Sequence, residues 1–193
     1  MIATILSGGN NRRMLRDKAF LQIGQKTIIE REIEVLSTLF SRIVVVTNAP
    51  ENHAHLAAEL VPDLVPGKGP LGGIYSGLIA SKDEYSFVVG CDLPFLNAGL
   101  ISHMIEAKNG YDAVIPKLSG FMEPLHAVYS RHCLMPIERQ LNRNELKIQS
   151  FFHEAKVRYI RESDIKRYDP KGIAFLNVNT EDDLKKARLV AEN

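Results

Sequence analysis

The chain has 193 residues, which is the size of a single domain and enough to bury one sizeable hydrophobic core. Hydrophobic residues make up 45% of it and charged residues 24%, as in an ordinary soluble globular protein. The formal net charge of +1 excludes a global basic field for nucleic acid or membranes, so an anionic substrate needs a local site.

The two cysteines, Cys91 and Cys133, show neither CxxC spacing nor His and Cys partners at the spacing of a zinc site. Two reduced thiols are typical of a cytoplasmic protein, and this is the location we expect. The amino-terminal run MIATILSGG lacks the basic start and the long apolar segment of a signal peptide. No apolar stretch approaches the roughly 20 residues that span a bilayer, so we expect no membrane partner.

Apolar runs rich in Ile and Val alternate along the chain with segments whose apolar residues recur at helical spacing. Residues 27–30 fit a capping box at the start of one helix, and Pro62 places one strand at a sheet edge. The expected strands are residues 2–6, 43–46, 60–65, 87–89, 113–115, 125–129, 157–160 and 175–178. The expected helices are residues 27–40, 52–60, 72–81, 97–108, 131–141, 145–155 and 180–190.

Continuous apolar strands that alternate with helices predict a three-layer α/β/α fold with a mostly parallel, Rossmann-like sheet covered on both faces. The chain shows no internal repeat, low-complexity stretch or long linker, so we expect one domain over residues 1–193. Residues 119–169 alternate less regularly than the rest. We expect them to form a small subsidiary lobe beside the main sheet.

A glycine pair with basic residues after it follows the first expected strand directly. Open α/β sheets bind ligands at the carboxyl ends of their strands, and paired glycines let backbone N–H groups approach a triphosphate. Nearby guanidinium and ammonium groups complement phosphate charge. The segment matches neither the P-loop nor the GxGxxG fingerprint, and a tight turn before a solvated basic stretch explains it equally well. The residues are Leu6, Ser7, Gly8, Gly9, Arg12, Arg13, Arg16 and Lys18.

An aspartate follows the strand expected at residues 87–89. Asp92 lies in the run Gly-Cys-Asp-Leu-Pro, and it should face the same edge of the sheet as the first glycine loop. Mg²⁺ prefers one or two carboxylates together with phosphate oxygens and water. Asp92 therefore fits a magnesium ligand, while an aspartate that caps the turn opened by Pro94 is the plain alternative.

Together these two motifs resemble the LAGGxSxRMGxDK and CDxP segments of molybdenum cofactor guanylyltransferases of the MobA type. That family lies within the glycosyltransferase-A-like nucleotidyltransferase superfamily. Residues 66–73 resemble the family's GPLxG loop, and residues 177–184, NVNTEDDL, resemble its closing NVNTPEDL motif. These matches span nearly the whole chain in the family's order, and their combination makes the resemblance specific.

The resemblance implies a set of nucleotide contacts. Asp63 would lie near the guanine or ribose, and Gly8, Gly9, Arg13 and Lys18 near the phosphates. Asn48 has a plain alternative as a turn residue, and Asp63 as an exposed loop acid. The implied catalytic residues are Lys18, Arg13 and Asp92, and the implied Mg²⁺ ligand is Asp92. The implied nucleotide-binding residues are Leu6, Ser7, Gly8, Gly9, Lys18, Asn48, Asp63 and Asp92.

The resemblance also implies the reaction, transfer of GMP from GTP to molybdenum-loaded molybdopterin with release of pyrophosphate. Residues 1–110 would form the nucleotide-binding half, and residues 111–193 the acceptor-binding half. Asn177 and Asn179, at the end of the last expected strand, are candidate acceptor contacts, although a turn with a helix cap explains them as well. His126 is either an acceptor-side residue or a core histidine.

Two departures from the family pattern bear on the site. Ser7 replaces the usual alanine, and Leu15 replaces a glycine, so the path of residues 14–17 should differ. His53 and His55, two positions apart, are expected at the surface.

Two other functions remain open, CMP transfer to the same cofactor and nucleotide binding by a regulatory protein without catalysis. Gly9 and the GPLGG run favour GTP, and the presence of Lys18 and Asp92 counts against the regulatory role. Expected partners are GTP, molybdopterin and, transiently, proteins that supply the cofactor or mature molybdoenzymes, with no nucleic acid.

Overall fold

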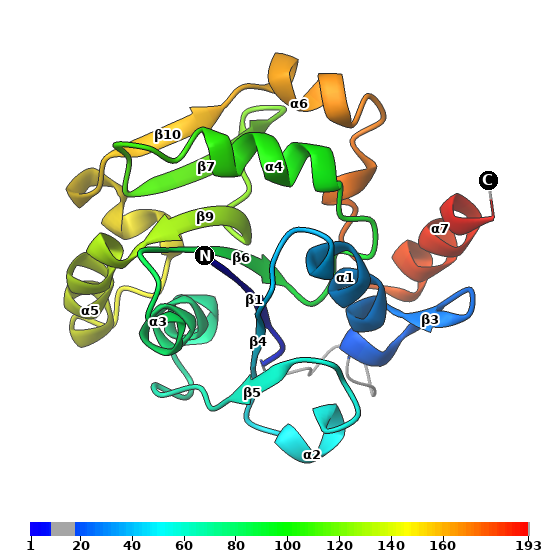
Figure 1. The fold of residues 1–193 in the computed structure, drawn as a ribbon, viewed down its shortest axis with the longest axis horizontal. Helices are drawn as coiled ribbons and strands as arrows, with labels where there is room; N and C mark the ends of the chain where they lie inside the picture. Colours follow the sequence, from blue (N-terminus) through cyan, green and yellow to red (C-terminus); the bar gives the residue numbers. More distant parts are fainter. Residues whose placement is uncertain (9–17, 193) are drawn as a thin grey trace.

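Runs of β-branched residues form the strands of a central sheet, because such side chains pack well on a pleated surface. The computed structural model describes residues 1–8 and 18–192. Its main sheet has the order β10-β7-β9-β6-β1-β4-β5, with β8 paired to β7 (Figure 1). The strands of this sheet are β1 (Ile2–Leu6), β4 (Ile43–Val46), β5 (Glu59–Val61), β6 (Tyr85–Gly90), β7 (Ala113–Leu118), β8 (Phe121–Met122), β9 (His126–Ser130) and β10 (Val157–Ile160).

Most pairings within this sheet are parallel. β1 pairs in parallel with β4 and β6, β4 with β5, and β7 with β10. β9 is antiparallel to both of its neighbours, β6 and β7, so it begins at the edge where the parallel strands end. This arrangement confirms the expected mostly parallel α/β sheet.

Helices cover both faces of the sheet. One layer contains α1, α4 and α6, and the other contains α3 and α5. Alternate residues of β1 serve the two layers, since Ala3 and Ile5 pack in the first core and Leu6 in the second. The helices are α1 (Ile28–Ser37), α2 (Pro50–His53), α3 (Gly69–Ser81), α4 (Ala98–Glu106), α5 (Leu134–Asn142), α6 (Glu162–Tyr168) and α7 (Glu181–Ala191).

Three segments differ from the sequence prediction. The helix expected at residues 52–60 is the single turn α2, and the chain then enters β5. Residues 145–155 contain a 3₁₀ helix, Ile148–Glu154, in place of an α-helix. The final strand expected at residues 175–178 is wrong, because Ile173–Phe175 forms a 3₁₀ turn. The backbone N–H of Val178 donates to the carbonyl of Asp92, at the end of the sheet, and not to a neighbouring strand.

The subsidiary lobe is formed by other residues than the expected 119–169. Residues 119–169 contribute β9 to the middle and β10 to the edge of the main sheet. The small separate sheet is the hairpin of β2 (Gln22–Ile23) and β3 (Lys26–Thr27), and α7 lies beside it although it is distant in sequence (Figure 1). Their shared apolar cluster consists of Leu21, Ile23, Ile28, Val178, Leu184 and Ala187. Residues 21–28 and 178–187, which are far apart in sequence, therefore pack together beside the main sheet.

Within residues 1–8 and 18–192, no helix has the length and apolar composition needed to cross a bilayer. The two cysteines are not joined by a disulfide.

Candidate active site

A cavity of about 480 Å³ opens at the carboxyl ends of β1 and β4, against the first turn of α3. This volume is within the range of about 300–1,000 Å³ that small-molecule sites occupy. Five of the predicted nucleotide contacts come together in its wall, although they are spread over more than 50 residues of sequence. The residues around the cavity are Leu6, Ser7, Gly8, Val46, Thr47, Asn48, Ala49, Asp63, Gly67, Gly69, Pro70, Gly73 and Cys91.

Gly9 and Arg13, the other predicted phosphate contacts of the first loop, lie outside the described residues. So do Arg12, Leu15 and Arg16.

Two glycines bring α3 close to β1 at the base of this cavity. A Cβ atom added to Gly77 would lie 2.5 Å from the Cγ2 atom of Thr4, and one added to Gly73 would lie 3.2 Å from a methyl carbon of Leu6. Thr4 leaves no room for a side chain at Gly77, and Leu6 would have to shift to admit one at Gly73. The glycine-rich sequence of α3 therefore allows the helix to approach β1, and its first turn borders the cavity.

Asp63 is held by hydrogen bonds to its carboxyl group and from its backbone N–H. Its Oδ1 atom accepts from the backbone N–H of Val65 and from the hydroxyl of Ser76, each at 3.1 Å. The Oδ1 atom of Asn48 accepts from the backbone N–H of Asp63 at 3.2 Å. Asn48 and Asp63 are thus coupled to each other at the cavity wall. Ser76, which is buried on α3, was not expected in the site.

Asp92 follows β6 at the same edge and lies near Lys18. Burial raises the pKa of the Asp92 carboxyl, and the charge of Lys18 opposes that shift. The ammonium group of Lys18 donates to Oδ1 of Asn179 at 2.6 Å. Three predicted residues from three distant segments therefore form one polar group beside the cavity. The Nδ2 atom of Asn177 donates to the carbonyl of Phe175 at 3.4 Å, which is a local contact.

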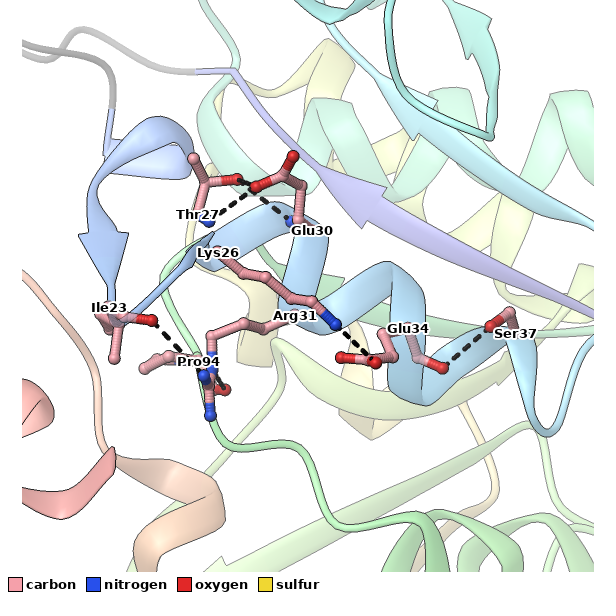
Figure 2. A network of polar contacts seen from close by, with 8 residues as sticks. All are labelled: Ile23, Lys26, Thr27, Glu30, Arg31, Glu34, Ser37 and Pro94. Carbon is pink, nitrogen blue, oxygen red and sulfur yellow. Dashed lines mark hydrogen bonds and ion pairs between the residues drawn. The ribbon is translucent and has the colours of Figure 1, made fainter. Parts of the chain in front are cut away.

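Helix α1 holds the loop that carries Asp92. The Oε1 atom of Glu32 accepts from the backbone N–H of Leu93 at 3.1 Å. Figure 2 shows Arg31 extending from the same helix to the carbonyl of Pro94, to which its Nε donates at 3.1 Å. The helix begins at the predicted capping box, in which the hydroxyl of Thr27 accepts from the backbone N–H of Glu30.

Glu32 and Glu123 are two further carboxyl groups close to Asp92. Burial raises the pKa of Glu32 well above its ordinary value, and the nearby charge of Asp92 adds to the shift. Burial and Asp92 also raise the pKa of Glu123. The sequence prediction missed Glu32, although its position three residues after Ile29 on the apolar stripe of α1 is a signal of burial.

No group of three or more His, Cys, Asp and Glu side chains in the described part of the chain is arranged to hold a metal ion. Mg²⁺ at a nucleotide site needs only one or two carboxylates, since phosphate oxygens and water complete its coordination. The half-buried carboxyl of Asp92, next to a cavity of nucleotide size, fits this requirement.

His126 is a core residue, the second of the two possibilities that the sequence left open. Its side chain is fully buried, and neither ring nitrogen has a hydrogen-bond partner among the described residues. Its ring packs against those of Phe87 and Phe175, with centroids 5.2 and 4.9 Å apart. Burial lowers the pKa of His126 to about 3.

This buried histidine predicts a loss of stability in mild acid. The unfolded chain takes up a proton at His126 near pH 6.5, whereas the folded protein takes it up only near its pKa of about 3. Stability is therefore lost as the pH falls below 6.5. We expect His126→Leu to remove about 2 kcal/mol of the difference in unfolding free energy between pH 7 and pH 5.

Urea unfolding of both proteins at the two pH values measures this difference. An equal pH dependence in wild type and variant would contradict it.

His53 was expected at the surface, and that expectation is wrong. Its side chain is fully buried, and its Nε2 atom lies 2.8 Å from the hydroxyl of Ser7. His55 is exposed as expected. The short helix α2 turns His53 inward, toward the end of β1, because the chain must return at once to form β5.

The fold and the site define an α/β protein with a nucleotide-sized cavity at the carboxyl ends of its parallel strands. The model of the MobA-like NTP transferase domain matches residues 3–158. The probable molybdenum cofactor guanylyltransferase of Pelotomaculum thermopropionicum is 38% identical over 98% of this chain and 92% of its own length. The molybdenum cofactor guanylyltransferase of Desulfosudis oleivorans is 37% identical over 95% of this chain and 92% of its own length.

Solved structures agree with these matches. Molybdopterin-guanine dinucleotide biosynthesis protein A from Archaeoglobus fulgidus superposes with a TM-score of 0.87 and 29% identity, covering 100% of this chain and 99% of its own. The 2-C-methyl-D-erythritol 4-phosphate cytidylyltransferase from Thermus thermophilus has a TM-score of 0.73 and 16% identity, covering 98% of each chain, and shares the fold alone. The chain belongs to the MobA-like NTP transferase family, among the molybdenum cofactor guanylyltransferases.

Proposed function

We propose that this protein transfers GMP from GTP to molybdenum-loaded molybdopterin, forming the guanine dinucleotide cofactor and releasing pyrophosphate. The relatives' names support guanylyl transfer over cytidylyl transfer and over a role without catalysis. The observation that carries the proposal is that Lys18 bonds to Asn179 and lies near Asp92, which directly follows Cys91 of the cavity wall. Distant segments of the chain converge there on a site that suits an anionic nucleotide.

The nucleotide in this proposal occupies the cavity. Asp63 and Asn48 contact the base or ribose, and the phosphates extend along Gly8 toward Lys18. Support comes from the placement of Leu6, Ser7, Gly8, Asn48 and Asp63 around one cavity. Gly9 and Arg13 are assigned to the phosphates on sequence resemblance. In this division residues 1–110 bind the nucleotide, and residues 111–193 bind the acceptor.

Asp92 is the residue that would hold Mg²⁺. When bound, the ion supplies positive charge and Lewis acidity at the phosphates. Asp92 lies in a loop that is fixed at Leu93 and Pro94 by α1, and at its own carbonyl by Val178. These contacts hold the backbone that carries the carboxyl group before any ligand arrives, so little ordering of the loop is required on binding.

Transfer requires little acid or base chemistry from the protein. The attacking group is a phosphate monoester of the pterin, which is ionised near neutral pH. Its oxygen forms a bond to the α-phosphorus of GTP, and the bond from that phosphorus to the β-phosphate bridge breaks, releasing pyrophosphate. Lys18 and Arg13 offset the charge on the departing pyrophosphate. Asn179, which bonds to Lys18, and Asn177 are assigned to the acceptor side.

We place the reaction in the cytoplasm, in keeping with two cysteines that form no disulfide. Transient contacts with proteins that supply the pterin or mature molybdoenzymes belong to the same proposal.

Pyrophosphate release with molybdenum-loaded molybdopterin and Mg²⁺, compared for GTP, CTP, ATP and UTP, tests the proposal. We expect GTP to give a kcat/KM at least about a hundredfold above the others, since buried polar groups left unpaired by a wrong base are costly. A preference for CTP would overturn the base assignment. Binding of GTP without release in the presence of the acceptor would overturn the transfer.

A further inference from the structure

The buried side chain of His53 connects α2 to the wall of the nucleotide cavity. Its Nδ1 atom lies 2.9 Å from the carbonyl oxygen of Ala49, and its Nε2 atom lies 2.8 Å from the hydroxyl oxygen of Ser7. Both Ala49 and Ser7 border the cavity, whereas His53 lies behind them and is completely inaccessible to solvent. Both ring nitrogens of the buried His53 side chain therefore have hydrogen-bond partners.

The directions of these two hydrogen bonds follow from the chemistry of the groups. A carbonyl oxygen only accepts, so Nδ1 of His53 carries the hydrogen and donates to Ala49. In the neutral ring Nε2 is then a bare acceptor, and the hydroxyl of Ser7 donates to it. The hydrogen bond therefore fixes the orientation of the Ser7 side chain, while its backbone N–H donates to the carbonyl of Val46 at 3.0 Å.

His53 also contacts the chain on the Lys18 side of the site. The ring of Phe20, in the same 3₁₀ turn as Lys18, packs against the ring of His53 with centroids 4.9 Å apart. One buried ring thus contacts both Ser7, where β1 ends, and Phe20, two residues after Lys18.

We propose that His53 is a positioning residue of the nucleotide site. Its contact with Ser7 holds the end of β1, and its contact with Phe20 holds the turn of Lys18, in the geometry that binds the nucleoside triphosphate. The inference rests on the proposed function for the identity of its ligand. It adds a residue on α2 that lies outside every motif by which the family was recognised. It also gives a role to Ser7, where the family usually has alanine.

His53→Phe tests this role, because phenylalanine preserves the ring that packs on Phe20 and removes both hydrogen bonds. We expect the Kd and the KM for GTP to rise about tenfold, because the side chain of Ser7 loses the buried hydrogen bond that orients it, with kcat within about threefold of wild type. The Kd is measured without acceptor, by titration calorimetry with Mg-GTP. The matched control, His55→Phe, changes an exposed histidine whose ring also lies against Phe20, with centroids 5.9 Å apart, and keeps a ring there, so it should leave both constants unchanged.

His53→Gln supplies the rescue, since its amide oxygen can accept from the Ser7 hydroxyl as Nε2 does. We expect it to recover at least half of the lost binding free energy. Ser7→Ala should also weaken GTP binding, because it leaves the buried Nε2 of His53 without a partner. The double variant Ser7→Ala/His53→Phe should bind GTP no more weakly than the weaker single variant, as expected for two residues that act through one contact.

A wild-type Kd and KM in folded His53→Phe would overturn the proposal. If that variant fails to fold, Ser7→Ala decides the matter, and unchanged GTP binding in it would overturn the proposal equally. Losses that simply add in the double variant would also contradict it. If wild type binds GTP without transferring GMP, or prefers another nucleotide, the proposed function fails, and the same Kd comparison with the bound nucleotide still tests His53.

Discussion

Replacing Asp92 with alanine is expected to lower kcat/KM for pyrophosphate release about a thousandfold while the protein remains folded. Loss of one group that stabilises transition-state charge commonly costs about 10²–10³ in rate, and loss of the Mg²⁺ ligand removes the ion's contribution as well. The fold should persist, because the loop is held through the backbone of Asp92, Leu93 and Pro94, which the substitution leaves intact.

Steady-state kinetics across a range of Mg²⁺ concentrations measures this effect, and thermal unfolding verifies the fold. Asp182→Ala is the matched control, since Asp182 lies exposed on α7 and pairs only with Lys185 in the described structure. It should retain the wild-type rate. A wild-type rate and an unchanged Mg²⁺ requirement in Asp92→Ala would show that another residue holds the metal.

The second large effect is expected at Lys18. Lys18→Met preserves much of the side chain's length and removes its charge, and we expect kcat to fall about a hundredfold, because the departing pyrophosphate loses a cation. The substitution also frees Oδ1 of Asn179, now 2.6 Å from the ammonium group. It further removes the charge that holds down the pKa of Asp92, so burial would raise that pKa further.

Single-turnover kinetics at saturating GTP separates this loss from weakened binding. Lys185→Met, an exposed lysine of α7, provides the control and should behave as wild type. Lys18→Arg should recover part of the rate, although a guanidinium does not reproduce the geometry of an ammonium group. A kcat within a factor of three of wild type in Lys18→Met would contradict the assignment of Lys18 to the phosphates.

The layers of the fold could be predicted because they depend on local patterns. The runs at Ile2–Leu6 and Ile43–Val46 are apolar throughout, as strands buried on both faces must be, and both are strands in the structure. The capping box at Thr27 likewise identified the start of α1. Each of these signals lies within a few residues of sequence and needs no knowledge of the partner segment.

The misassigned segments have tertiary causes. Residues 175–178 are apolar like a strand, but Val178 is buried against β2 and α7 and its N–H bonds to Asp92, so burial without a strand partner explains the pattern. The antiparallel insertion of β9 between β6 and β7 depends on pairing of distant segments, which periodicity does not report.

Family resemblance pointed to five of the residues that line the cavity, and it missed residues that hold the site from behind. His53 and Glu32 are polar residues on helices, a pattern typical of solvent-exposed faces. His53 bonds to Ser7, and Glu32 bonds to Leu93, so the role of each depends on a partner 46 or 61 residues away. The burial of His53 becomes visible only once the fold brings it to Ser7, whereas the position of Glu32 on the apolar stripe of α1 already indicates burial.

Transfer of a label from GTP to the pterin follows the proposed reaction from substrate to product. GTP labelled at its α-phosphate is incubated with the protein, Mg²⁺ and molybdenum-loaded molybdopterin, and the products are separated and identified by mass. We expect the label to pass into a pterin–guanine dinucleotide, the released pyrophosphate to be unlabelled, and transfer to depend on the pterin. Label that remains in GTP, or that is released as free GMP at the same rate without the pterin, would contradict it.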